Sequence, residues 1–176
     1  LPGKNGGSHE VGPGTHVFVP ISAVPGVGSP DIYSFDMTIQ YAPAVLEVVN
    51  VGVAGEALAA GFSLAYNNNA GTGQVAIAEY SAQNPLTHPG GVIAEIEFHV
   101  LGNYGATSSL TFSQVSIDEG AVPATLSNGL FTVDCSGAVD GTPCDADGSV
   151  CTANDTCQGG VCQPGAAPDC DDHNAC

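Results

Sequence analysis

The sequence predicts an all-β sandwich followed by an irregular, disulfide-rich extension, and three observations carry this prediction. Over the first 134 residues, short apolar stretches with a period of two alternate with turns rich in Gly, Pro and Asn. All seven cysteines lie at or after Cys135. The residues after Cys135 show no hydrophobic periodicity. We therefore divide the chain into an N-terminal arm or poor first strand (1–14), a sandwich (15–134) and a Cys-rich segment (135–176).

Two segments show the alternation typical of a strand with one buried face. In residues 33–41, "YSFDMTIQY", every second side chain is apolar, which predicts that Tyr33 and Tyr41 face the core and Asp36 faces outward. In residues 92–100, "VIAEIEFHV", the intervening Glu95, Glu97 and His99 are expected outside. The same criteria predict strands at 15–22, 45–51, 73–80, 109–117 and 128–133, and a short helix at 55–62 that ends at Gly61.

The composition excludes several functions. The chain of 176 residues carries a net charge of −17, and Lys4 is its only basic residue. Binding to nucleic acid or to anionic lipid needs clustered Lys and Arg, so neither is expected. The sequence contains no run of 18 apolar residues, so it predicts no membrane-spanning helix. The start of the sequence lacks the charged and apolar regions of a signal peptide, so we interpret it as a mature or trimmed N-terminus.

The cysteine spacing favours disulfides over zinc. Successive cysteines are separated by eight, six, five, four, seven and five residues, so the C-x₂-C pair typical of zinc sites is absent. Dense cysteines in a loop-rich segment indicate disulfides and an oxidising compartment, hence an extracellular or cell-surface location. We expect four cysteines to pair among themselves and the hinge cysteine to join the sandwich or a later cysteine. The four cysteines expected to pair among themselves are Cys144, Cys151, Cys157 and Cys162. The hinge cysteine is Cys135, which could instead pair with Cys144 or Cys170. The remaining cysteine is Cys176.

The extension contains an internal repeat. "TPCDADGSVC" matches "PDCDDHNAC", which aligns Cys144 with Cys170 and Cys151 with Cys176. We interpret the segment as one repeat unit plus the start of a second.

Acidic residues in this repeat suggest a calcium site. Asp145, Asp147 and Asp155 supply the hard oxygen ligands that calcium prefers. The pattern is not an EF-hand, because Val150 stands where that loop requires Gly. The alternative is that these aspartates cap turns through their short side chains.

Residues 17–51, "VFVPISAVPGVGSPDIYSFDMTIQYAPAVLEVVNV", resemble the start of a cohesin domain. "GGVIAEIEFHVLG", "LTFSQVSI" and "NGLFTV" resemble its later strands, so the resemblance covers residues 15–133. It implies a nine-stranded jelly-roll sandwich that is non-catalytic. It also implies that one exposed sheet face binds a calcium-loaded dockerin module in an extracellular assembly.

The resemblance also implies four partner-binding positions. The aspartate of the family's third-strand motif falls on Asp36, and its neighbouring Asn position falls on Ser34. The tyrosine position falls on Tyr66 and the glutamate position on Glu79. Glu79 shares its strand parity with core residues, so an outward role there requires a bulge or a strand end.

Two alternative functions remain open. The stretch "LPGKNGGSHEVG" is too Gly-rich and polar for a good first strand, so the sandwich could accept a strand from a neighbouring copy and form a fibre. The odd number of cysteines fits such an assembly. Carbohydrate binding is disfavoured because the chain has no Trp and only five Tyr. Catalysis is not expected, because the five His are scattered and match no catalytic motif.

Overall fold

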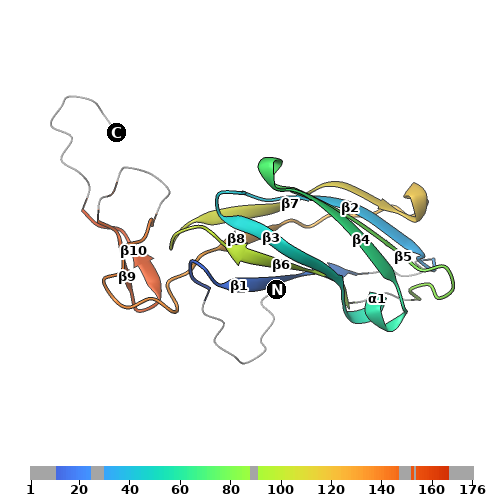
Figure 1. Ribbon diagram of the computed structural model, residues 1–176, viewed down its shortest axis with the longest axis horizontal. Coiled ribbons are helices and arrows are strands. Elements are labelled where there is room, and N and C mark those ends of the chain that lie inside the picture. The colour runs from blue at the N-terminus through green and yellow to red at the C-terminus, as the bar shows by residue number, and fades with distance from the viewer. Residues whose placement is uncertain (1–10, 25–29, 88–90, 147–151, 153, 167–176) are drawn as a thin grey trace.

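The computed structural model describes residues 11–24, 30–87, 91–146, 152 and 154–166, and Figure 1 shows the arrangement of its elements. The strands are β1 (His16–Ala23), β2 (Ser34–Gln40), β3 (Leu46–Val53), β4 (Ser63–Asn69), β5 (Gln74–Tyr80), β6 (Gly91–Val100), β7 (Thr107–Ile117), β8 (Gly129–Thr132), β9 (Thr156–Gln158) and β10 (Val161–Gln163). A short helix α1 (Gly55–Ala59) and two 3₁₀ turns, η1 (Ala70–Thr72) and η2 (Asp118–Gly120), complete the elements.

Two antiparallel sheets face each other and enclose the core. One has three strands in the order β1-β6-β3, and the other has five in the order β4-β5-β2-β7-β8. The inner sides of both sheets are lined by fully buried apolar side chains, among them Phe35, Val75, Ile96 and Phe98. The expected β-sandwich with a disulfide-rich extension is thus confirmed.

The alternation in the sequence translates into burial. In β2, Phe35, Met37 and Ile39 are buried between more exposed neighbours. Tyr33 corrects the expectation that it faces the core: it precedes the first paired residue of β2 and its side chain is 45% exposed. Strand β4 is not among the predicted strands, because its sequence "SLAYNNN" has few apolar residues and ends in an Asn run that is typical of a turn.

Two disulfides and the β9–β10 hairpin form the described part of the extension. Cys135 is bonded to Cys157, and Cys144 is bonded to Cys162. The Cys144–Cys162 bond joins two of the four cysteines that were expected to pair among themselves. The Cys135–Cys157 bond corrects the expectation for Cys157, because it joins that residue to the hinge cysteine. Three further cysteines, Cys151, Cys170 and Cys176, lie outside the described residues.

The extension is attached to the end of the sandwich, at the loop between β6 and β7 (Figure 1). The backbone N–H of Asp145 donates to the carbonyl oxygen of Tyr104 at 2.9 Å. Gly105 has a φ of +91°, and a Cβ there would overlap the carbonyl oxygen of Asp145. Only glycine fits both the backbone conformation and the close approach.

The N-terminal arm is described only from residue 11 onward. Residues 12–15 form a turn in which Thr15 donates from its backbone and its Oγ1 to the carbonyl oxygen of Gly12, at 3.1 and 2.7 Å. The rest of the predicted arm lies outside the described residues. None of the helices in the described ranges is long and apolar enough to cross a membrane.

Candidate functional site

The outer face of the five-stranded sheet is nearly free of charge. Its five strands contain two charged residues, Asp36 in β2 and Glu79 in β5. Alternation places them on opposite sides of the sheet: Asp36 is exposed, whereas Glu79 is only 1% exposed. Within its strands, the outer face therefore presents a single carboxylate, that of Asp36.

Small side chains make the centre of this face low and open. Asp36 lies opposite Ala78 on β5 and Ser116 on β7, and Ala78 lies opposite Ala65 on β4. In the next row, Thr38 lies opposite Ala76. Asp36, Thr38 and the three alanines line a shallow depression of about 330 Å³, which also includes Tyr66, Asn67 and Gln114.

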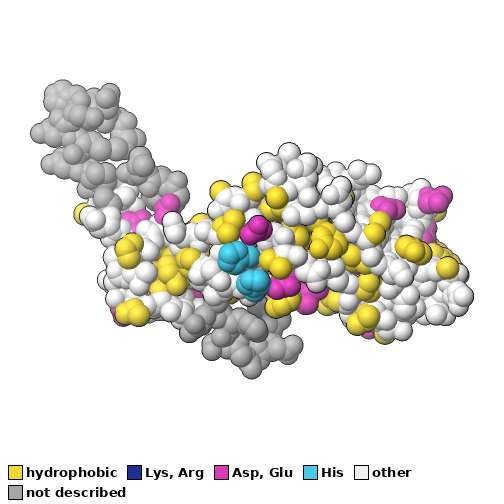
Figure 2. All heavy atoms as spheres, viewed as in Figure 1, with side chains coloured by type: hydrophobic (Ala, Val, Ile, Leu, Met, Phe, Trp, Pro, Cys, Tyr) yellow, Lys and Arg dark blue, Asp and Glu magenta, His cyan; other side chains and the backbone are white. Residues whose placement is uncertain are grey.

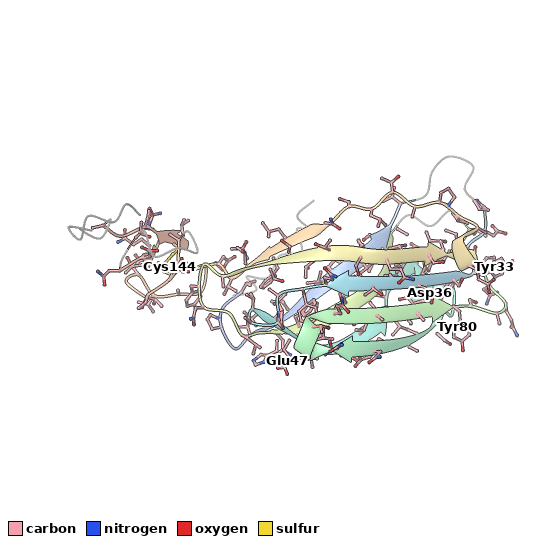
Figure 3. The ribbon with its side chains drawn as sticks, turned by 90° about the horizontal axis from the view of Figure 1, so that it is seen from above. Tyr33, Asp36, Glu47, Tyr80 and Cys144 are labelled. Carbon is pink, nitrogen blue, oxygen red and sulfur yellow. A yellow bond between two sulfur atoms is a disulfide. The ribbon has the colours of Figure 1, made fainter. Side chains whose placement is uncertain are left out.

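One end of the face is fixed by a turn and flanked by tyrosines. The carboxylate of Asp118, in a left-handed backbone conformation with φ of +47°, accepts hydrogen bonds from the backbone N–H groups of Tyr33 and Ser34 at 2.8 and 2.7 Å. Ser34 lies opposite Tyr80, whose ring is 58% exposed. Figure 3 shows Tyr33, Tyr80 and Asp36 on this half of the sheet.

Tyr66 lies at the margin of the face. It pairs with Ile77, which is buried, so alternation directs its side chain to the inner side of the sheet. Because β4 is the edge strand, the ring remains 40% exposed there. The structure thus brings Ser34 and Asp36 together on one face and sets Tyr66 beside it.

Glu79 faces the core. Strand β5 pairs with both neighbours in unbroken register from Gln74 to Tyr80, so no bulge turns Glu79 outward. It lies between Phe35 and Leu64, and its burial raises the pKa of the carboxyl to about 7. Within the described residues, neither carboxyl oxygen has a hydrogen-bond partner. The assignment of Glu79 to the partner-binding surface is therefore corrected.

Of the three aspartates predicted to bind calcium, Asp155 is buried and Asp145 is exposed. The buried carboxylate of Asp155 accepts hydrogen bonds from the backbone N–H groups of Ala146 and Gly165, at 2.9 and 2.8 Å, and from Thr152 Oγ1 at 3.0 Å. These donors, led by the Ala146 amide, lower its pKa. Asp155 therefore anchors the loops of the extension. Asp145 is exposed and Asp147 lies outside the described residues, so calcium binding here stays a prediction.

The chain belongs to the cohesin domain family, whose sequence model matches residues 5–133. No curated protein matches the sequence. The match covers the whole sandwich and ends before the Cys-rich extension.

Solved cohesin structures share this fold. A non-cellulosomal cohesin from Archaeoglobus fulgidus is 20% identical, with a TM-score of 0.54 over 69% of this chain and 82% of that chain. The Coh-OlpA-Doc918 cohesin–dockerin complex from Clostridium thermocellum is 19% identical, with a TM-score of 0.57 over 68% of this chain and 89% of that chain. The sixth cohesin of scaffoldin B from Acetivibrio cellulolyticus, in complex with a Cel5 dockerin, is 18% identical, with a TM-score of 0.54 over 69% of this chain and 91% of that chain.

Proposed function

We propose that this chain is an extracellular, non-catalytic assembly module that binds a dockerin-like protein through the outer face of its five-stranded sheet. The single observation that carries the proposal is the uncharged, alanine-floored surface around Asp36. Membership of the cohesin family and the fold shared with cohesins solved in dockerin complexes support the choice of partner class.

The composition of this face suits a protein interface. The cores of protein–protein interfaces are depleted in charged residues and enriched in aromatic ones. Here Ala65, Ala76 and Ala78 leave room for a partner element to approach the sheet, and Tyr33 and Tyr80 supply aromatic area at one end. A catalytic role would instead require converging nucleophile, base and orienting groups.

Asp36 provides specificity in this arrangement. A carboxylate that becomes buried at an interface is costly unless a donor on the partner binds it. A partner that places a hydroxyl, amide or basic group opposite Asp36 is therefore preferred over one that does not. The net charge of −17 further favours a partner with a basic surface and accelerates its association at low salt.

The proposal is tested by titrating the protein with calcium-loaded dockerin modules, including those of the two complexes named above, in a calorimeter. We expect at least one to bind and Asp36→Arg to weaken that binding by about 30-fold or more, the effect of about 2 kcal/mol expected for loss of a buried charged contact. Glu95→Arg, which makes the same charge change on the opposite sheet, serves as the matched control and should retain affinity. Absence of binding to every dockerin, or equal losses in both variants, contradicts the proposal.

A second candidate function is strand acceptance from another copy of the chain. Among the described residues, β1 pairs with β6 along one edge and with no strand along the other. Beside that open edge lies an apolar groove of about 110 Å³ between the sheets, lined by Val19, Ile21, Leu110 and Phe112 among others. An unpaired edge next to apolar pockets is the geometry that accepts an added strand. Light scattering after size exclusion, with increasing mass at increasing concentration, would favour this function, and a constant monomer mass would exclude it.

A further inference from the structure

The outer face of the three-stranded sheet is chemically different from the face around Asp36. It carries the two described histidines, His16 on β1 and His99 on β6, in one cross-strand row with Glu47 on β3. Glu97 lies two residues from His99 on the same side of β6. Figure 2 shows the two imidazoles in contact with acidic side chains at the centre of this face.

The two histidines are as close as a sheet allows. They are directly opposite each other in an antiparallel pair. The flanking hydrogen bond, from the N–H of Val100 to the carbonyl oxygen of Thr15 at 2.9 Å, identifies them as a non-hydrogen-bonded pair, the type with the shorter Cα separation. Their ring centroids are 5.2 Å apart and the rings are inclined by 41°.

In each histidine, a glutamate carboxylate lies next to the Nδ1 atom of the imidazole ring. His16 Nδ1 is 2.7 Å from Glu97 Oε1, and His99 Nδ1 is 3.5 Å from Glu47 Oε2. A carboxylate at Nδ1 favours the tautomer that carries its proton there, which leaves the lone pair on Nε2. Metal-binding histidines commonly have this arrangement, in which a carboxylate orients the ring and increases the basicity of the ligating nitrogen.

We propose that His16 and His99 form a binding site for a divalent transition-metal ion of the zinc class, with Nε2 of each ring as ligand and with Glu97 and Glu47 orienting the rings. A metal–nitrogen bond of about 2.1 Å and a tetrahedral angle place the centroids of two ligating imidazoles about 5 Å apart. The observed centroid separation of 5.2 Å agrees with this value, and side-chain rotation of the two exposed rings directs both Nε2 atoms to one ion. Water completes the coordination.

The surroundings support a cation at this position. The side chains of His16 and His99 are 49% and 33% exposed, so an ion can reach them from solvent. Glu47, Glu97 and the net charge of −17 attract cations, and the chain contains one Lys and no Arg. Imidazole nitrogen selects zinc, copper and nickel over calcium and magnesium.

Glu47 and Glu97 are assigned to the imidazole rings and not to the ion, because neither carboxylate forms a group of three close ligand atoms with the two histidines. Within the described residues, the one set of three ligand-type groups whose ligand atoms lie within 4.8 Å of one another consists of Cys135, Cys144 and Cys162. These cysteines are disulfide-bonded and cannot act as thiolate ligands. The site on the three-stranded sheet therefore offers two protein ligands, and it is independent of the proposed partner-binding face.

Calorimetric titration of the whole chain with ZnCl₂ at pH 7.5, with calcium in excess to occupy weak carboxylate sites, tests the site. We expect one zinc equivalent, a loss of affinity of at least about 10-fold in His16→Gln and in His99→Gln, and a loss of about 10- to 100-fold in Glu97→Gln. Proton NMR signals of the two imidazoles should shift on addition of zinc. If the double variant His16→Gln/His99→Gln binds zinc as tightly as the wild type, or if the wild type binds no zinc, the assignment is wrong.

A matched control separates this site from the other histidines. The triple variant His9→Gln/His88→Gln/His173→Gln changes the same residue type elsewhere and should leave the zinc affinity of the site unchanged. Loss of binding in this triple variant, with retention in the double variant, would place the zinc site elsewhere and overturn the proposal. A purely structural role of the His–Glu pairs would give no zinc-dependent NMR shift in the wild type.

Discussion

Glu79→Gln removes a carboxyl that the fold buries in the sandwich core, and its effect on stability should depend on pH. Burial raises the pKa of Glu79 from 4.5 to about 7, because the ionised form loses its hydration and, within the described residues, gains no hydrogen bond in return. Between these values the folded state holds a proton that the unfolded state has released. The contribution of Glu79 to the free energy of unfolding should therefore be greatest below pH 4.5, fall as the pH rises toward 7, and stay constant above it.

The size of this fall follows from the interval between the two pKa values. At about 1.4 kcal/mol for each pH unit, the interval of about 2.5 units corresponds to about 3 kcal/mol of stability lost from the wild type. The glutamine introduced by Glu79→Gln cannot ionise, although its amide occupies the same unpaired position. The variant should thus differ from the wild type by a constant amount below pH 4.5 and gain about 3 kcal/mol relative to it by pH 8.

Urea denaturation at intervals between pH 4 and pH 8 measures this difference. Glu56→Gln, which removes an exposed glutamate from α1, controls for the general effect of one fewer negative charge on a chain of net charge −17. The quantity of interest is the change in stability on Glu79→Gln minus the change on Glu56→Gln at each pH. Parallel pH profiles of the two variants would refute the argument that the buried carboxyl of Glu79 is destabilised by desolvation.

Three further predictions concern the core and the extension. Phe98→Ala, which removes a fully buried ring packed edge-on against Tyr41, should lower the unfolding free energy by about 3–5 kcal/mol in urea denaturation. Gly105→Ala should detach the extension and make it sensitive to limited proteolysis, whereas Gly14→Ala, at a positive φ with open space around it, should not. Asp155→Asn should speed hydrogen exchange of the amides that Asp155 binds; because its pKa is lowered, the wild type should lose the same protection as the pH falls through that pKa.

The sequence was informative where one face of a strand is buried. Alternation predicted the inward residues of β2, and those of β6 from Ala94 to Val100, because a one-residue slip would expose Phe35 or Phe98. At the start of β6, next to a register shift, Ile93 is buried instead of Val92. It failed at β4, an edge strand whose polar residues are stable there only because β5 supplies the hydrogen-bond ladder. That pairing is a tertiary effect with no local signal.

The candidate site was predictable only in part. Asp36 followed from alternation, and its place on an uncharged face follows from the register of β5 and β7, which no single strand encodes. The parity of Glu79 with Val75 and Ile77 is the sequence signal that places its side chain in the core, against the outward position implied by the family resemblance. The His16–His99 pair depends on the pairing of strands about 80 residues apart, so spacing in the sequence could not reveal it.

Methyl NMR of the alanine residues, recorded with and without a bound calcium-loaded dockerin, identifies the sheet face that contacts the partner. We expect the methyl signals of Ala65, Ala76 and Ala78 to shift or broaden on binding, whereas that of Ala138 in the extension should not change. Shifts confined to the extension or to residues of the three-stranded sheet, with these three alanines unchanged, would contradict a partner-binding role for the outer face of the five-stranded sheet.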